Sequence, residues 1–303
     1  MKILALYKEV CEQVLAVPVI DGQKSESEKF AGASKTYSIE ALMGDGRALQ
    51  AGTSHNLGQN FAKAFDIQFQ GRDKTVQHAW TTSWGVTTRL IGAVIMTHGD
   101  DSGLILPPAI APYQVVIVPI PRGNWKETVL PKCEEIKAQL TAAGIRVKLD
   151  ADESQTPGWK FAEYEMRGVP LRLEIGPKDI EKEQAVLVRR DTREKAFLPL
   201  AGLAQAVKEK LDAMQADLLA RARKFVADNT TRVSSYDQFK QVMSDRRGFL
   251  VAGWCEDAAC EAAIKQETKA TVRVIPIEGD AVAGACVRCG KPSPREVYFA
   301  QAY

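Results

Sequence analysis

Hydrophobic and polar positions alternate along the chain in patterns that predict a series of helices and strands. Apolar residues at helical spacing predict a first helix over residues 2–15. A polar stretch with two glycines predicts a surface loop over 21–38. A short strand over 48–50 then leads into a group of small, hydrogen-bonding residues, and a helical pattern follows. We expect this polar group, residues 50–56, to lie at a strand-to-helix turn.

A similar arrangement follows in the next forty residues or so of chain. A strand over 79–84 precedes Gly85, a Thr-Thr pair, and Arg89 at the start of an apolar helix over 90–96. An arginine in this place suits a nucleotide, because its planar cation can lie on a base and pair with phosphate oxygens. On the residue types alone, a structural ion pair for Arg89 and a core position for His55 are the simpler interpretations.

A proline-rich segment, residues 101–114, predicts a domain boundary, because proline at this density stops regular structure. Beyond it, apolar runs alternate with helical patterns, which is typical of a sheet covered by helices. The predicted strands cover 114–120, 145–149, 171–175 and 185–190, and the predicted helices cover 127–143, 158–167 and 203–227. A smaller unit of two helices and three strands follows, and we predict three domains: 1–112, 113–232 and 233–303.

Composition excludes several classes of protein. Hydrophobic residues make up 45% of the 303 residues, charged residues 26%, and the formal net charge is +2. These values are ordinary for a soluble protein, so any nucleic-acid contact must come from local basic patches. Neither a membrane-length apolar run nor a secretory leader is evident, and we expect a cytoplasmic protein that does not contact a membrane.

The six cysteines fall into two groups. Cys11 and Cys133 lie on apolar helical faces and are predicted to be reduced, buried thiols. The other four form two close pairs, with four and two intervening residues: Cys255 and Cys260, then Cys286 and Cys289. Two such pairs brought together would surround a tetrahedral Zn²⁺ with four thiolates, a closed site of structural type. The alternative is four reduced cysteines in a core.

Two longer stretches resemble a known family. GVTTRLIGA, followed by HGDD, is similar to motif 3 of the class II aminoacyl-tRNA synthetases. TSHNLGQNFAKAF and TSWGVTTRLIGA together resemble the prolyl-tRNA synthetases of the archaeal and eukaryotic type, and the resemblance covers essentially the whole chain. It implies a multidomain α/β and α+β fold: part of an antiparallel-sheet catalytic domain, an α/β anticodon-binding domain with a mixed sheet, and a small α+β zinc-binding C-terminal domain.

The resemblance also implies roles for residues in the first domain. Gln50, Thr53, Thr87 and Arg89 match residues that contact ATP, with Gln50 also near Mg²⁺. His55 matches a residue of the proline pocket, and Trp84 and Gly85 are expected to form part of its wall. In this chemistry the proline carboxylate attacks the α-phosphate of ATP and pyrophosphate leaves. The protein must position two anions and neutralise growing charge, a task for Arg89 and Mg²⁺.

Contacts with the anticodon of tRNA(Pro) are expected in the second domain. Stretches that resemble the anticodon-binding face contain Glu165, Arg172, Asp179 and Lys195, and such side chains can bind the edges of unstacked guanines. Solvated charges at a sheet edge are the alternative. Similar enzymes end in a tyrosine whose terminal carboxylate turns toward the active site, so Tyr303 has either that role or that of an ordinary strand end.

Motifs 1 and 2 of the resembled family have no counterpart in this sequence. Motif 2 supplies an arginine for the α-phosphate and part of the proline site, and motif 1 contributes to the dimer interface of the intact enzymes. We therefore expect the C-terminal part of a synthetase that is not competent alone. A non-catalytic, zinc-containing tRNA-binding protein is the second hypothesis, and a threonyl- or histidyl-specific enzyme is a distant third.

Overall fold

Segments from both ends of the chain form one compact unit of the protein. The structure, a computed structural model, describes residues 1–277 and 284–303. The first compact unit contains residues 1–13, 17–97 and 222–303, and the second contains 14–16 and 98–221. The division into three domains stays a prediction.

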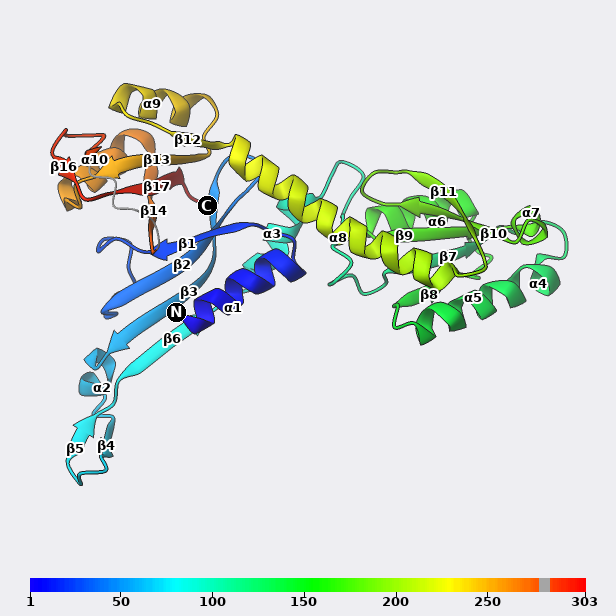
Figure 1. Cartoon of the computed structure of the whole chain (residues 1–303), viewed down its shortest axis with the longest axis horizontal. Helices are drawn as coiled ribbons and strands as arrows, with labels where there is room; N and C mark the ends of the chain where they lie inside the picture. The colour runs from blue at the N-terminus through cyan, green and yellow to red at the C-terminus, as the bar shows by residue number, and fades with distance from the viewer. Residues whose placement is uncertain (278–283) are drawn as a thin grey trace. The chain divides into compact units, whose positions relative to one another are not determined.

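An eight-stranded sheet is the basis of the first unit (Figure 1), with strand order β12-β13-β17-β14-β1-β2-β3-β6. All neighbours pair antiparallel except β12 and β13. The strands are β1 (Val19–Gln23), β2 (Lys35–Leu42), β3 (Ala48–Gly58), β6 (Thr81–Gly85), β12 (Thr230–Arg232), β13 (Phe249–Trp254), β14 (Ala270–Pro276) and β17 (Arg295–Gln301). Strands from the N-terminal hundred residues and the C-terminal seventy thus form one sheet, which the sequence pattern did not predict.

Helices and two small hairpins complete the first unit. The first predicted helix is present as α1 (Lys2–Glu9) followed by a π-helical turn (Val10–Val14). The remaining elements are α2 (Asn60–Ala64), α3 (Arg89–His98), α9 (Tyr236–Asp245), α10 (Ala258–Thr268), the hairpin strands β4 (Gln68–Gln70) and β5 (Val76–His78), and the short pair β15 (Gly284–Ala285) and β16 (Pro292–Ser293). His98, the last residue of α3, belongs to the second unit.

Two expectations for the N-terminal region were wrong. The stretch 21–38 is not simply a surface loop, because it contains the end of β1 and the start of β2, and Lys24 and Ser25 are buried. The polar group at 50–56 is not at a strand-to-helix turn, because the 11-residue strand β3 runs through it. Pairing with β2 on one side and β6 on the other provides ladder partners that extend the strand.

The seam between the N-terminal and C-terminal strands depends on one glycine. β14 pairs with β1 through Gly22–Pro276 and Gln23–Ile275. A Cβ atom at Gly22 would lie 2.5 Å from the carbonyl oxygen of Ile275 and 2.6 Å from the Cβ of Val274. Only a residue without a side chain allows this close approach of two backbones.

The second unit contains a five-stranded mixed sheet, in agreement with the predicted α/β architecture. Its order is β11-β10-β9-β7-β8; β8, β7 and β9 are parallel, and β10 and β11 are antiparallel to their neighbours. The strands are β7 (Val115–Pro119), β8 (Val147–Leu149), β9 (Leu171–Ile175), β10 (Gln184–Arg189) and β11 (Lys195–Pro199), and the helices are α4 (Trp125–Thr128), α5 (Leu130–Ala142), α6 (Pro157–Met166) and α7 (Pro177–Glu181).

The apolar core of this unit joins the sheet to its helices. Ile117, Leu171 and Leu173 from the strands pack with Ile136 and Leu140 of α5. The single helix predicted over 127–143 is split into α4 and α5 at Val129, two residues before Pro131, which has no N–H to continue the helical hydrogen bonds. The long helix α8 (Leu203–Asp228) belongs to the second unit up to Arg221 and to the first unit thereafter. Among the described residues, no helix is both long enough and apolar enough to cross a membrane.

Candidate substrate, tRNA and metal sites

Three predicted substrate residues lie on one face of β3. Cross-strand partners share a face of a sheet, and the register pairs Gln50 with Glu40, Thr53 with Ser38, and His55 with Thr36. Glu40, Ser38 and Thr36 alternate along β2 and so share that face. Helix α1 lies against the other face, where Tyr7 approaches Gly52. The face with Gln50, Thr53 and His55 is therefore the one that α1 does not cover.

His55 is held by neighbours on this face. Its Nδ1 lies 3.0 Å from the hydroxyl of Thr36, and its ring is 4.9 Å from the ring of Phe30. The backbone N–H of Phe30 donates to the same hydroxyl at 3.0 Å. Partial burial lowers the pKa of His55, so the imidazole is neutral near pH 7. A neutral, oriented imidazole can make a directional hydrogen bond to a small ligand.

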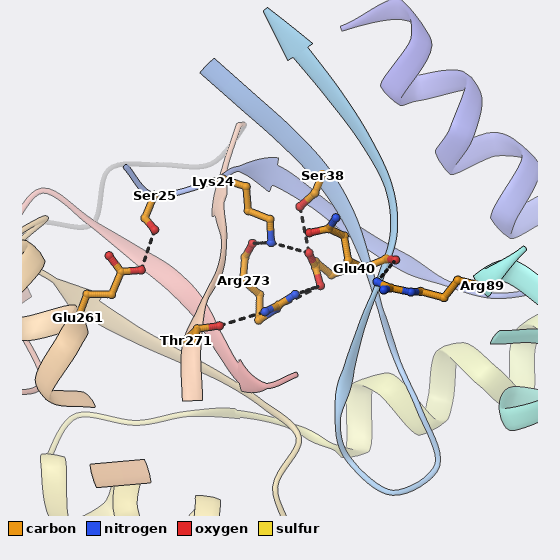
Figure 2. A network of polar contacts seen from close by, with 9 residues as sticks. Lys24, Ser25, Ser38, Glu40, Arg89, Glu261, Thr271 and Arg273 are labelled. Carbon is orange, nitrogen blue, oxygen red and sulfur yellow. Dashed lines mark hydrogen bonds and ion pairs between the residues drawn. The ribbon is translucent and has the colours of Figure 1, made fainter. Parts of the chain in front are cut away.

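Arg89 lies beside Gln50, as the first residue of α3. Its Nη1 donates to the backbone carbonyl oxygen of Gln50 at 3.4 Å (Figure 2). Its backbone N–H donates to the hydroxyl of Thr87 at 3.3 Å. Arg89 is exposed, and no carboxylate of the described residues pairs with it, so the ion-pair interpretation has no support. The guanidinium keeps N–H groups that can meet an anion.

The strand register separates the two predicted wall residues. Gly85 pairs with Thr53 and lies on the face of Gln50 and His55, whereas Trp84 pairs with Ser54 and points to the opposite face. Ser83, which pairs with His55, shares the substrate face instead. The alternation of a strand could have identified Ser83 if the strand's register had been known. The structure thus brings together Gln50, Thr53, His55, Gly85 and Arg89.

The four clustered cysteines form a compact sulfur cage at the C-terminal end of the first unit. Cys255 follows β13, Cys260 lies on α10, and Cys286 and Cys289 follow β15. Their Sγ atoms all lie within 4.8 Å of one another, and those of Cys255 and Cys289 are 3.7 Å apart. Four Zn–S bonds of about 2.3 Å in a tetrahedron place sulfurs about 3.8 Å apart, so the donor set fits a tetrahedral metal ion.

Backbone hydrogen bonds shape this cage. The N–H of Cys286 donates to the carbonyl of Lys291, and the N–H of Gly290 donates to the carbonyl of Cys286. A hydrogen bond from the backbone N–H of Lys291 is the main reason that the pKa of Cys289 is lowered to about 7, whereas burial raises the pKa of Cys255 and of Cys260. A thiol with a lowered pKa supplies a thiolate ligand readily. The other two cysteines are buried as predicted, and burial raises the pKa of Cys11 to about 11 and of Cys133 to about 12.

A small basic cavity of about 150 Å³ lies in the second unit. Three of the four predicted anticodon residues line it, namely Glu165, Arg172 and Lys195. Its other lining residues are Tyr164, Val169, Val188, Arg189, Arg190 and Arg193. The guanidinium of Arg172 pairs with Glu174 at 2.8 Å and stacks on Phe161 at 4.1 Å, which fixes its plane.

An ion pair between a buried arginine and an exposed carboxylate fixes one side chain of the cavity lining. Arg190 makes two hydrogen bonds to Asp100, at 2.6 and 2.9 Å, and these bonds are the main cause that lowers the pKa of Asp100 to about 2. Asp179 lies outside the cavity. Its carboxylate accepts a hydrogen bond from the N–H of Gly176 at 2.9 Å. This contact caps the start of α7 and stabilises the local fold.

The C-terminal residues run beside the start of β3. The N–H of Tyr303 donates to the carbonyl of Ala48 at 3.2 Å, and the guanidinium of Arg47 lies 5.6 Å from the centre of its ring. Ala48 is two residues from Gln50. The role predicted for the terminal carboxylate of Tyr303 stays a prediction.

Comparisons with known proteins cover the whole chain. A family model for the anticodon binding domain matches residues 114–210, and a model for the C-terminal region of prolyl-tRNA synthetase matches residues 236–303. The chain is 53% identical to a proline–tRNA ligase of Lachnospira eligens and 52% identical to one of Ruminiclostridium cellulolyticum, over its full length in both cases. It is 52% identical, over 99% of its length, to proline–tRNA ligase 2 of Clostridioides difficile.

These matches span only part of the relatives. The chain corresponds to 62%, 63% and 62% of the lengths of those three proteins. Within that span, the four-cysteine cluster and the mixed α/β unit lie in the segments that the two family models match. Since identity of about one half extends along the entire chain, the protein belongs to the prolyl-tRNA synthetase family.

Proposed function

We propose that the chain provides tRNA binding and part of the substrate site of a proline–tRNA ligase, which activates proline with ATP and transfers it to tRNA(Pro). The observation that carries this proposal is the identity of about one half over the whole chain to proline–tRNA ligases. Because the chain spans about 62% of those relatives, the complete activity is proposed for a protein that contains the full catalytic domain.

Arg89, Gln50, Thr53 and Thr87 are the proposed ATP-binding residues. The exposed guanidinium of Arg89, held 3.4 Å from the carbonyl of Gln50, is suited to neutralise phosphate charge during adenylation. The resemblance of the family motif supports a Mg²⁺ ion near Gln50. His55 and Gly85 are proposed to bind proline on the same face, and Trp84 would contribute only indirectly from the opposite face.

The cavity of the second unit is the proposed anticodon site. Arg172 and Lys195 supply donors and Glu165 an acceptor, the combination that binds the edges of an unstacked guanine. Arg189 and Arg190 are buried in ion pairs with aspartates, whereas the exposed Arg193 is placed to attract an RNA backbone. Asp179 is proposed to act only through the loop that it caps. The stretch 113–232 would be the anticodon-binding domain and 233–303 the zinc-binding domain.

Zn²⁺ is the metal that we propose for Cys255, Cys260, Cys286 and Cys289. Four thiolates leave no open position for a substrate, so the ion would stabilise the fold around α10 and β13. A homodimer, as in the intact family, is the proposed assembly of the complete enzyme.

Two measurements on the purified chain test this function. The first is proline-dependent exchange of pyrophosphate into ATP, with Arg89→Ala expected to abolish any exchange. The second is the affinity for tRNA(Pro), with Arg172→Ala expected to weaken it at least tenfold. Arg122→Ala is the matched control, because Arg122 is an exposed arginine of the second unit that does not line the cavity.

The outcomes separate the hypotheses. If the chain binds tRNA(Pro) through Arg172 but does not exchange pyrophosphate, it needs the rest of its catalytic domain. Adding that missing part should then restore pyrophosphate exchange if the protein is an enzyme, and should not restore it if the protein is a non-catalytic tRNA-binding protein. A chain that neither exchanges pyrophosphate nor discriminates tRNA(Pro) from other tRNAs refutes the proposal.

A further inference from the structure

A buried ionic cluster crosses the seam between the N-terminal and C-terminal strands. Lys24, Glu40 and Arg273 are 3%, 0% and 5% exposed. The Nζ of Lys24 donates to Oε1 of Glu40 at 2.7 Å, and Nε and Nη2 of Arg273 donate to Oε2 at 3.1 and 2.8 Å. Lys24 also donates to the backbone carbonyl of Arg273 at 2.9 Å. One buried carboxylate thus joins two cations that are 249 positions apart in sequence.

Hydroxyl groups complete the cluster (Figure 2). Ser38 donates to Oε1 of Glu40 at 3.1 Å, and Nη1 of Arg273 donates to the hydroxyl of Thr271 at 3.0 Å. Both carboxylate oxygens of Glu40 are therefore occupied, which makes direct coordination of a ligand by Glu40 inconsistent with this geometry. The proposed chemistry uses none of these groups.

Two β-bulges occur at this cluster. In β14 the register shifts between Val272 and Val274, so that Arg273 is the extra residue. In β3 the partners of Ile39 and Glu40 are Gly52 and Gln50, so that Ala51 is the extra residue. A bulge redirects a side chain and is frequent beside active sites. Here one bulge accompanies the approach of Arg273 to Glu40, and the other accompanies the placement of Gln50 opposite Glu40.

The cluster adjoins the candidate nucleotide-binding residues. Glu40 is the direct cross-strand neighbour of Gln50, on the same face of the sheet. The carbonyl of Gln50 in turn accepts from Arg89 at 3.4 Å. A short path of contacts therefore leads from β14, through β2 and β3, to the first residue of α3, and Figure 2 labels Arg273, Glu40 and Arg89 along it.

A second link ties the same loop to the cysteine-bearing helix. Ser25 follows Lys24 and donates to Oε1 of Glu261 on α10 at 2.6 Å, with both residues buried. Lys265, on the same helix, pairs with Glu28 at 3.1 Å. The segment that carries Lys24 is thus held from the C-terminal region at two further points.

We propose that Arg273 is a positioning residue for the nucleotide site: by holding Glu40, it sets the bulge in β3 and so the place of Gln50 and of the carbonyl that receives Arg89. The C-terminal strands would then contribute to substrate binding without touching the substrate. This inference rests on the proposed function, in which Gln50 and Arg89 bind ATP.

The test compares three variants of the whole chain. Arg273→Met removes the charge and the donor fork while keeping an unbranched side chain, Arg273→Lys keeps the charge but not the fork, and Glu40→Gln removes the carboxylate while keeping its shape. Arg295→Met is the matched control, because Arg295 lies on the neighbouring strand β17 and pairs with Glu256 at 3.4 Å with about half of its side chain exposed.

Two properties are measured for each variant. The first is amide hydrogen exchange in the ligand-free chain, which we expect to accelerate at least tenfold across residues 49–53 in Arg273→Met, with residues 249–254 of β13 unchanged. The second is the affinity for Mg·ATP, which we expect to fall about tenfold in Arg273→Met and Glu40→Gln, less in Arg273→Lys, and not at all in Arg295→Met.

The outcomes have distinct meanings. If amide hydrogen exchange accelerates equally in β3 and β13, the cluster only stabilises the fold and the inference is overturned. Unchanged amide hydrogen exchange at residues 49–53 in all three variants overturns it as well. If the unsubstituted chain binds no Mg·ATP, its nucleotide site needs the rest of the catalytic domain, and the pattern of amide hydrogen exchange alone then decides whether Arg273 positions β3. If Arg273→Met does not fold, Arg273→Lys and Glu40→Gln provide the same comparison.

Discussion

Replacing Gly22 by alanine should separate β14 from β1 and weaken the first unit. The new Cβ would lie 2.5 Å from the carbonyl oxygen of Ile275 and 2.6 Å from the Cβ of Val274. Unbonded carbon atoms ordinarily approach to about 3.5–4.0 Å, so the strands would have to move apart by about 1 Å. Neither obstacle is the end of a flexible side chain, so no rotamer change can relieve the overlap.

The size of the effect follows from what that movement breaks. Overpacking costs about 1–3 kcal/mol, and the loss of one seam hydrogen bond adds about 0.5–1.5 kcal/mol. Only two residue pairs join β1 to β14, so no neighbouring pairs compensate. We expect the free energy of unfolding to fall by about 2–4 kcal/mol and the melting temperature by about 5–15 °C.

Differential scanning calorimetry measures this change, and hydrogen exchange locates it. Gly92→Ala is the control, because a Cβ there would meet only the terminal methyl of Met96 at an ordinary 3.7 Å, and alanine favours a helix. A Gly22→Ala protein that melts within about 1 °C of the unsubstituted chain, with protected amides along β1 and β14, would refute the argument from close approach.

Three further outcomes follow from the structure. The pKa of Asp100 is lowered below its ordinary value of about 3.9, so its ion pair with Arg190 stabilises the protein above about pH 4 and this contribution disappears as the pH falls through about 2. Asp100→Asn should therefore cost about 1 kcal/mol in urea unfolding at pH 6, allowing for solvent screening, and almost nothing near pH 2; an equal cost at both pH values would contradict this. Cys286→Ser should reduce the bound metal per chain to near zero, whereas Cys11→Ala should leave it unchanged. Elemental mass spectrometry measures this metal content, and full occupancy in Cys286→Ser would exclude the four cysteines as the metal site. Leu173→Ala, in the core of the second unit, should cost about 2–5 kcal/mol, while Phe197→Ala on an exposed site of the same sheet should stay within about 0.5 kcal/mol, and equal costs would contradict the assigned burial.

Local patterns were sufficient where the chain alternates clearly. β7 was predicted because a strand that is buried on both faces is apolar at every position. α5 was predicted because a helix that is buried on one face has apolar residues at helical spacing. The cysteine pairs were predicted from spacing, because a tetrahedral site needs four thiolates from short loops. The elements α7 and β11 were missed, since both are short and β11 has alternating exposed residues.

The substrate residues were assigned from the resemblance to a family, because the residue types alone favoured structural roles for Arg89 and His55. Gln50, Thr53 and His55 have no spacing of their own that indicates a nucleotide, because a bulge at Ala51 brings them to one face of β3. Arg89 joins them from α3, which comes later in the chain. The pairing of β3 with β6 removes Trp84 from their face. One residue of difference along a strand decides between two opposite surfaces.

By itself, the amino-acid sequence determined the periodic elements of the second unit, the composition of the sulfur cage and the family. Only the tertiary structure decided that β14 and β1 share one sheet, that Lys24 is buried rather than in a surface loop, and that Arg273 meets Glu40. The contacts of Arg273 with Lys24 and Glu40 alone join residues that lie 249 and 233 positions apart. Local sequence pattern reports a residue's neighbours along the chain, whereas burial and ion pairing are set by whichever distant strand lies beside it.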